Sequence, residues 1–141
     1  MQYQYSYKII IFKKTKENTY YLLFQIENEW SLFKYFIQDK QYNIHDIENK
    51  LIKELNFQSF EFVSGFKHNV RKNFIFEAEL IKKTSIWLLL KLKNLKFKPI
   101  KKYKIHKWAN LNIALKYLKF PSDCRALKKC GEFVNIPRLL N

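Results

Sequence analysis

The sequence predicts an α+β fold in which helices pack on a mixed β-sheet. Residues 3–11 carry Tyr or Ile at every second position, a polar break follows at 13–19, and residues 20–26 resume a strand pattern, which is typical of a β-hairpin. Apolar residues then recur at helical spacing between residues 43 and 56. A chain of 141 residues that is 48% apolar can bury one core, so we expect a single domain over residues 1–141.

The remaining elements follow in order along the chain. Residues 31–38 form a shorter extended stretch before the helix at 43–56, for which Asn43 is the expected N-cap and Asn56 the left-handed C-terminal residue. Three β-type segments are then predicted at 58–66, 73–81 and 85–93, followed by a basic loop at 94–107, a helix at 110–119 and a last helix from Pro121 to about Gly131. Most of the strand aromatics are expected in the core, namely Tyr3, Tyr5, Tyr7, Phe74, Phe76 and Trp87.

The positive charge is concentrated in the second part of the chain. The net charge is +15, yet the first 60 residues hold 8 lysines against 7 acids, whereas the rest hold 19 basic against 5 acidic residues. Such a field attracts polyanions, so RNA or a ribonucleoprotein is the expected partner. The scarcity of arginine favours contacts with phosphates over sequence-specific contacts with the bases. The candidate phosphate contacts are Lys82, Lys83, Lys91, Lys93, Lys96, Lys98, Lys101, Lys102, Lys104 and Lys107.

The composition also bears on location. The longest apolar run is strand-sized, and the first seven residues lack the apolar core of a secretory signal. Two cysteines are typical of a reducing compartment, and the abundance of Lys, Asn, Ile, Phe and Tyr is typical of an AT-rich genome. We therefore expect a cytoplasmic protein without a membrane span, or alternatively one from the mitochondrial matrix or another AT-rich organelle.

Two stretches carry a resemblance to a known family. Residues 30–37 read Trp-Ser-Leu-Phe-Lys-Tyr-Phe-Ile before the predicted helix, and Ile105-His106-Lys107-Trp108 precede the helix at 110–119. In order and spacing the chain resembles the Nudix hydrolases, especially the small branch that cleaves diadenosine tetraphosphate. The family's Nudix box would run here from Tyr35 to Phe57. The resemblance implies an α/β/α sandwich with a mixed sheet, one Nudix-type helix and two C-terminal helices.

Most of the box residues of that family are replaced in this sequence. Its glycine, arginine and glutamate positions are occupied by Tyr35, Gln41, Asn49, Lys50, Lys53, Glu54 and Asn56, of which only Glu54 has the family's residue. Nudix chemistry relies on carboxylates that hold Mg²⁺, which binds oxygen ligands and not ammonium groups. Two ammonium groups ~4–5 Å from the ion would repel it by several kcal/mol at an effective dielectric near 20. We therefore expect no metal, no cofactor and no catalysis by the family mechanism, with Glu54 paired to Lys50 on the helix surface.

Three hypotheses about function remain open at this stage. The first is a catalytically inactive Nudix-like module that binds RNA or a ribonucleoprotein through its basic half. The second is a nucleotide sensor in which Lys34, Lys50 and Lys53 hold phosphates and Tyr35 lies against the base. The third is a divergent hydrolase of nucleoside or dinucleoside polyphosphates that combines Glu54 with another acid such as Asp39 or Glu48. The resemblance also puts Trp30, Tyr35 and Phe36 around the old cleft, which a large side chain at position 35 is expected to fill in part.

Overall fold

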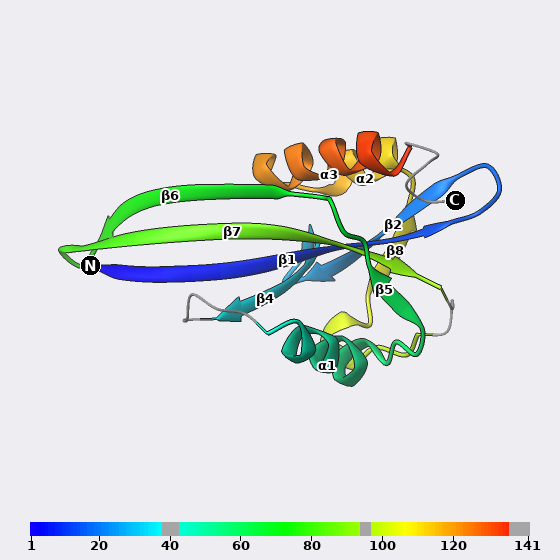
Figure 1. Cartoon of the computed structure of the whole chain (residues 1–141), viewed down its shortest axis with the longest axis horizontal. Coiled ribbons are helices and arrows are strands. Elements are labelled where there is room, and N and C mark those ends of the chain that lie inside the picture. The colour runs from blue at the N-terminus through cyan, green and yellow to red at the C-terminus, as the bar shows by residue number, and fades with distance from the viewer. Residues whose placement is uncertain (38–42, 94–96, 136–141) are drawn as a thin grey trace.

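The computed structural model describes residues 1–37, 43–93 and 97–135 and has a mixed β-sheet between two layers of helices (Figure 1). Helix α1 (Ile44–Leu55) covers one face, and α2 (Leu111–Tyr117) and α3 (Pro121–Val134) cover the other. This arrangement confirms the predicted α+β sandwich with one helix on one side and two on the other. None of the helices in the described ranges is long and apolar enough to cross a membrane.

Two long parallel strands form the centre of the sheet. They are β1 and β7, which pair from Gln2 opposite Ile81 to Phe12 opposite Lys91. Strands β2 and β4 pair with β1, β3 and β8 pair with β2, and β5 and β6 pair with β7, all of them antiparallel. The bounds of the eight described strands are β1 (Gln2–Lys14), β2 (Thr19–Ile26), β3 (Glu29–Ser31), β4 (Phe33–Ile37), β5 (Phe60–Phe62), β6 (His68–Phe76), β7 (Glu79–Leu92) and β8 (His106–Ala109).

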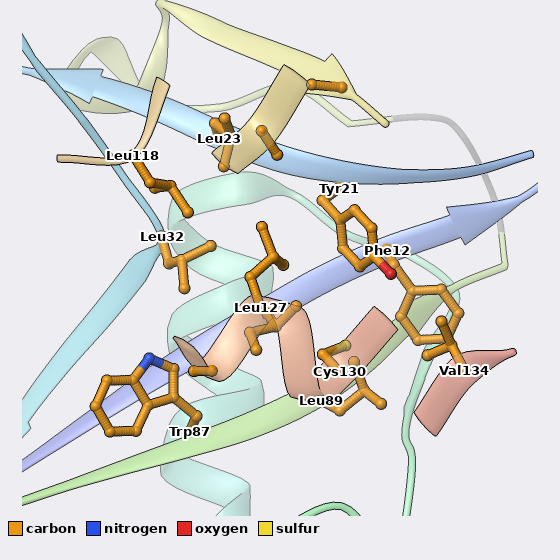
Figure 2. Packing of buried hydrophobic residues seen from close by; sticks show 14 of the residues in the cluster. Phe12, Tyr21, Leu23, Leu32, Trp87, Leu89, Leu118, Leu127, Cys130 and Val134 are labelled. Atoms are coloured by element: carbon orange, nitrogen blue, oxygen red, sulfur yellow. The ribbon is translucent and has the colours of Figure 1, made fainter. Parts of the chain in front are cut away.

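The alternation along β1 divides the core into two layers. Ile9 and Ile11 face α1 and are fully buried with Leu51. Ile10 and Phe12 point to the opposite face, where α3 packs on the sheet through residues such as Leu127 (Figure 2). Successive strand side chains point to opposite faces, so a strand with apolar residues at consecutive positions must be covered on both sides.

The second half of the sheet differs from the prediction in several places. The predicted strand at 73–81 is interrupted by a turn, and the separate strand at 85–93 is part of the longer β7. Glu77 and Ala78 form this turn with φ of 51° and 62°. Such two-residue turns usually contain Asn or Gly, and the absence of both explains why no turn was predicted here. The segment at 58–66 contains only the short β5, the basic loop contains a 3-10 helix, η1 (Lys101–Tyr103), and β8, and the last helix continues past Gly131 to Val134.

Three of the aromatics assigned to the core lie at the surface. Tyr3, Phe74 and Phe76 are 40%, 41% and 60% exposed, whereas Tyr7 and Trp87 are buried as expected. The exposed residues belong to the end of the sheet that extends beyond the helices in Figure 1. A strand pattern alone does not tell where the covering layer ends, which is why these positions were predicted wrongly.

Replacement of Ala78 by glycine should stabilise the protein by about 1 kcal/mol, because Ala78 adopts a left-handed conformation that costs a residue with a Cβ atom. Urea unfolding of the two proteins would measure the difference. Ala114→Gly, in the buried part of α2, is the contrasting control and should destabilise. An unchanged or lower midpoint for Ala78→Gly would contradict the assigned turn.

Candidate functional site

Helix α1 presents the altered box positions to an open pocket. Its caps are those predicted: the Asn43 side chain accepts a hydrogen bond from the His45 N–H at 2.9 Å, and Asn56 has φ of 57°. Its apolar stripe packs on the sheet, so the flank beside the stripe remains accessible. A pocket of about 440 Å³ is lined by Tyr35, Asp46, Asn49, Lys50, Lys53, Glu54 and Ile100. Tyr35 therefore forms part of a pocket wall and does not close the space.

Lys50 is the centre of the contacts in this first pocket. Its ammonium nitrogen lies 3.6 Å from Oε2 of Glu54, as predicted for residues four positions apart on a helix. The same nitrogen lies 5.2 Å from the centre of the Tyr35 ring, within cation–π range. Among the described residues, Oε2 of Glu54 is buried and has no hydrogen bond. Lys50 thus brings one positive charge to the single carboxylate that the box retains.

These residues do not fit the divalent cation that Nudix chemistry uses. Magnesium requires a near-octahedral set of oxygen ligands. In the described ranges, no three His, Cys, Asp or Glu side chains are close enough together to hold a metal ion. Lys50 and Lys53 line the pocket beside the two acids Asp46 and Glu54, and their ammonium groups would repel the ion. Gln41 and Asp39, two further candidates from the sequence, lie outside the described residues.

A second pocket adjoins the first and shares Lys50 with it. Its volume is about 340 Å³, and it collects lysines from three elements: Lys34 of β4, Lys50 of α1 and Lys102 of η1. Glu29 also lines it, and its carboxylate is paired with Lys119 at 3.0 Å. The other lining residues are Ile26, Glu27, Ser31, Leu32, Phe36, Tyr103 and Phe120. The pocket therefore combines ammonium groups with an exposed aromatic ring on β4.

A third pocket of about 260 Å³ lies on the α3 side of the sheet and shares Lys34, Phe36 and Phe120 with the second. It is lined by four lysines and three serines, of which Lys8 and Lys34 are directly opposite each other on β1 and β4. Like charges in opposite positions destabilise a sheet. The complete lining is Ser6, Lys8, Lys34, Phe36, Val70, Lys72, Lys83, Ser85, Trp87, Phe120 and Ser122.

A buried carboxylate behind the third pocket compensates one of these charges. Asp123 is fully buried near the start of α3, and its Oδ1 accepts hydrogen bonds from Lys8 Nζ at 2.7 Å and from Trp87 Nε1 at 3.3 Å. Burial lowers the pKa of Lys34 below its usual value, and the charge of Lys8 lowers it further. The positive charge of Lys34 is thus only partly compensated, so an anion in the pocket would be stabilised.

The structure gathers some of the predicted residues and separates others. Lys34, Lys50, Lys53 and Tyr35, the predicted nucleotide contacts, all line the first or second pocket. Lys8 and Asp123, which are 115 positions apart, were not among the predicted site residues. Two signals were available: a lysine within the apolar run of β1, and the only acid between residues 81 and 129. Trp30, expected at the cleft, packs instead on the Tyr117 ring with 5.6 Å between ring centres.

The predicted RNA contacts do not share one surface. Lys82 and Lys83 are neighbours on β7, so their side chains point to opposite faces of the sheet. Lys93 follows the end of the same strand, about 35 Å from Lys82 at the rise of an extended chain. Only Lys83 and Lys102 line the pockets. Lys107 donates a hydrogen bond to the Tyr117 hydroxyl at 2.8 Å, and Lys93 pairs with Glu61 at 3.2 Å. Lys96 lies outside the described residues, and the others of the set, Lys91, Lys98, Lys101 and Lys104, are exposed or half-buried.

The capped helix α1, the mixed sheet and the two C-terminal helices form the α/β/α sandwich that the sequence predicted. No protein-family model and no curated protein sequence matches the chain. Among solved structures, an Ap4A hydrolase of C. elegans in a binary complex has a TM-score of 0.74 at 16% identity over 93% of this chain and 97% of that chain. The dihydroneopterin triphosphate pyrophosphohydrolase of E. coli has a TM-score of 0.66 at 12% identity, covering 92% and 97%.

A third similar structure is the NUDIX domain of Shewanella oneidensis NrtR complexed with ADP ribose, with a TM-score of 0.65 at 14% identity over 93% of this chain and 88% of that chain. These matches cover nearly the whole of each chain at low identity. The chain therefore has the Nudix fold, and the resemblance that the sequence indicated is confirmed at the level of the fold.

Proposed function

We propose that this protein is a catalytically inactive Nudix-fold module that binds a nucleoside polyphosphate without a divalent cation. The observation that carries the proposal is the position of Lys50, which faces Glu54 and the Tyr35 ring and lines both the first and the second pocket. A lysine there can contact phosphate directly, as lysines in phosphate sites commonly do. One similar structure, the NUDIX domain of Shewanella oneidensis NrtR, is a complex with ADP ribose, and another is an Ap4A hydrolase.

The neighbouring groups support the same ligand class. Lys34 is common to the second and third pockets, so a chain of phosphates could extend from Lys50 past Lys34 towards Lys8. Phe36 is 67% exposed and Phe120 37% exposed, and both rings line the same two pockets. Aromatic rings beside a positively charged groove are suited to stack a base. A nucleotide thus accounts for the lysines and the aromatics together.

Calorimetry with ATP and with a dinucleoside polyphosphate in EDTA is the direct test. We expect binding without Mg²⁺, and no gain in affinity when Mg²⁺ is added, because the metal would neutralise the phosphates that the lysines contact. Lys34→Gln and Lys50→Gln should each weaken binding about tenfold or more, as expected for the loss of a charge-assisted contact. Lys128→Gln, on an exposed position of α3, is the matched control and should bind normally. Absence of heat in both conditions would refute nucleotide binding.

A hydrolysis assay separates this proposal from the third hypothesis. With Mg²⁺ or Mn²⁺ and a panel of nucleoside and dinucleoside polyphosphates, we expect no product. Hydrolysis that Glu54→Gln abolishes would show a divergent enzyme and would overturn the inactive module.

RNA or a ribonucleoprotein surface is the second candidate partner, favoured by the concentration of positive charge after residue 60. Contact with the phosphate backbone would be steeply dependent on salt. Lys101 and Lys104 do not line any of the three pockets. The double variant Lys101→Gln/Lys104→Gln should therefore weaken RNA binding in a gel shift and leave the affinity for nucleotides unchanged. RNA binding that is absent at low salt, or indifferent to salt, would exclude this candidate.

A further inference from the structure

The β6–β7 hairpin forms an arm whose surface is unusually apolar. All residues from Arg71 to Leu80 are exposed, and with the start of β1 the arm extends beyond the helices in Figure 1. Phe74, Ile75 and Phe76 are 41%, 75% and 60% exposed. Residues at alternate positions of a strand lie on opposite faces, so Ile75 is on one face of the arm and the two phenylalanines are on the other. Apolar groups on both faces at one tip are typical of a surface that binds another protein chain.

The free edge of the arm is the backbone of β6. Among the described strands, β6 pairs only with β7, so its other edge presents N–H and C=O groups to which a further strand can bind. The charges along this edge are separated: Arg71 and Lys72 are in the middle of β6, and Glu77 follows at the tip. A strand with this distribution is complementary to its own copy when the two run antiparallel.

We propose that two copies of this chain form a symmetric dimer in which their β6 strands pair antiparallel, with Phe74 opposite the partner's Phe74. This register sets Arg71 beside the partner's Glu77, twice by symmetry, and brings two aromatic rings together at the centre. Pairs of aromatic and of oppositely charged side chains across strands both stabilise a sheet. The dimer also extends the sheet across both copies and removes the exposed edge from each.

Other registers of the two β6 strands give less favourable pairs of opposite side chains. A register centred on Lys72 would set two lysines directly against each other, which is destabilising. One centred on Asn73 places Arg71 opposite Ile75 and creates no pair of opposite charges. One centred on Ile75 aligns only the last three residues of each strand. The charges therefore select the register centred on Phe74, and this inference is independent of the nucleotide site.

Sedimentation equilibrium of the full chain and of two charge-reversed variants tests the dimer. Arg71→Glu places two acids together in the proposed register, and Glu77→Arg places two arginines together. Each variant alone should lose at least about tenfold in dimer affinity, whereas an equimolar mixture of the two should form a heterodimer because its contacts are again between opposite charges. Lys128→Glu, on α3, is the control and should dimerise like the unaltered chain.

The mixture is the decisive measurement, because adhesion through the apolar tip alone would not depend on which charges are combined. Arg71 and Glu77 are both exposed, and circular dichroism of each variant verifies that it is folded. A monomer at about 100 μM, which corresponds to weak association at best, would overturn the proposal. A dimer that neither charge reversal weakens would also overturn it, and so would two variants that remain monomeric when mixed.

Discussion

Asp123→Asn is expected to destabilise the protein by about 3 kcal/mol. The substitution keeps the shape of the side chain and an oxygen for Trp87 Nε1, but it removes the carboxylate that holds the Lys8 ammonium at 2.7 Å. Breaking one partner of a buried ion pair typically costs about 3–5 kcal/mol, because the other charge is left uncompensated. The lower end of that range applies here, since the Lys8 side chain is 13% exposed and can turn towards the third pocket. Urea unfolding would measure the loss.

The double variant Lys8→Met/Asp123→Asn is the control for this prediction. It removes both charges and keeps an oxygen for Trp87 Nε1, so most of the lost stability should return, because no uncompensated charge is left buried. The single variant has a second consequence for the site: the loss of Asp123 leaves Lys8 and Lys34 with more positive charge between them, so nucleotide affinity should not fall. A stability loss below about 1 kcal/mol would mean that the pair contributes no more than an exposed ion pair does.

The parts of this fold that the sequence predicted are those with local causes. Helix α1 was predicted with both caps, because Asn43 and Asn56 act on backbone groups a few positions away. The β1–β2 hairpin was also predicted, since a polar break separates two alternating runs. The turn at Glu77–Ala78 was missed because its positive φ angles depend on the pairing of two long strands and not on turn residues.

The residues of the candidate site show the same division between local and long-range causes. Lys50 and Lys53 were found because the Nudix-like spacing assigns them to the box, and α1 then fixes their common side, whereas Lys34 directly precedes the box on β4. The contribution of Lys8 and Asp123 depends on a contact between β1 and α3, which no local pattern reports. The RNA contacts were grouped by their position in the sequence, whereas the sheet distributes Lys82, Lys83 and their neighbours over opposite faces. A count of charges indicates a class of partner, but the fold decides which charges can act together.

Lys50→Glu combined with Lys53→Glu should give the protein a divalent-cation site, whereas we expect the unaltered chain to bind no such ion. The two new carboxylates would join Glu54 in the first pocket and supply oxygen ligands where ammonium groups now repel the ion. Replacing two positive by two negative charges ~4–5 Å from a divalent ion changes the Coulomb interaction by roughly 30 kcal/mol at an effective dielectric near 20, before desolvation and screening are counted. Electron paramagnetic resonance of added Mn²⁺ would then show bound metal for the double variant at concentrations where the unaltered chain binds none.

The control is Lys50→Gln/Lys53→Gln, which removes the repulsion without adding ligands and should bind Mn²⁺ weakly at most. The double glutamate variant should at the same time lose nucleotide binding in EDTA, because its carboxylates repel phosphates, and regain part of it when Mn²⁺ is present. This reversal of metal dependence follows from charge alone, with the same fold and the same pocket. Binding of Mn²⁺ by the unaltered chain as tight as by the double variant would mean that Lys50 and Lys53 do not keep the ion out.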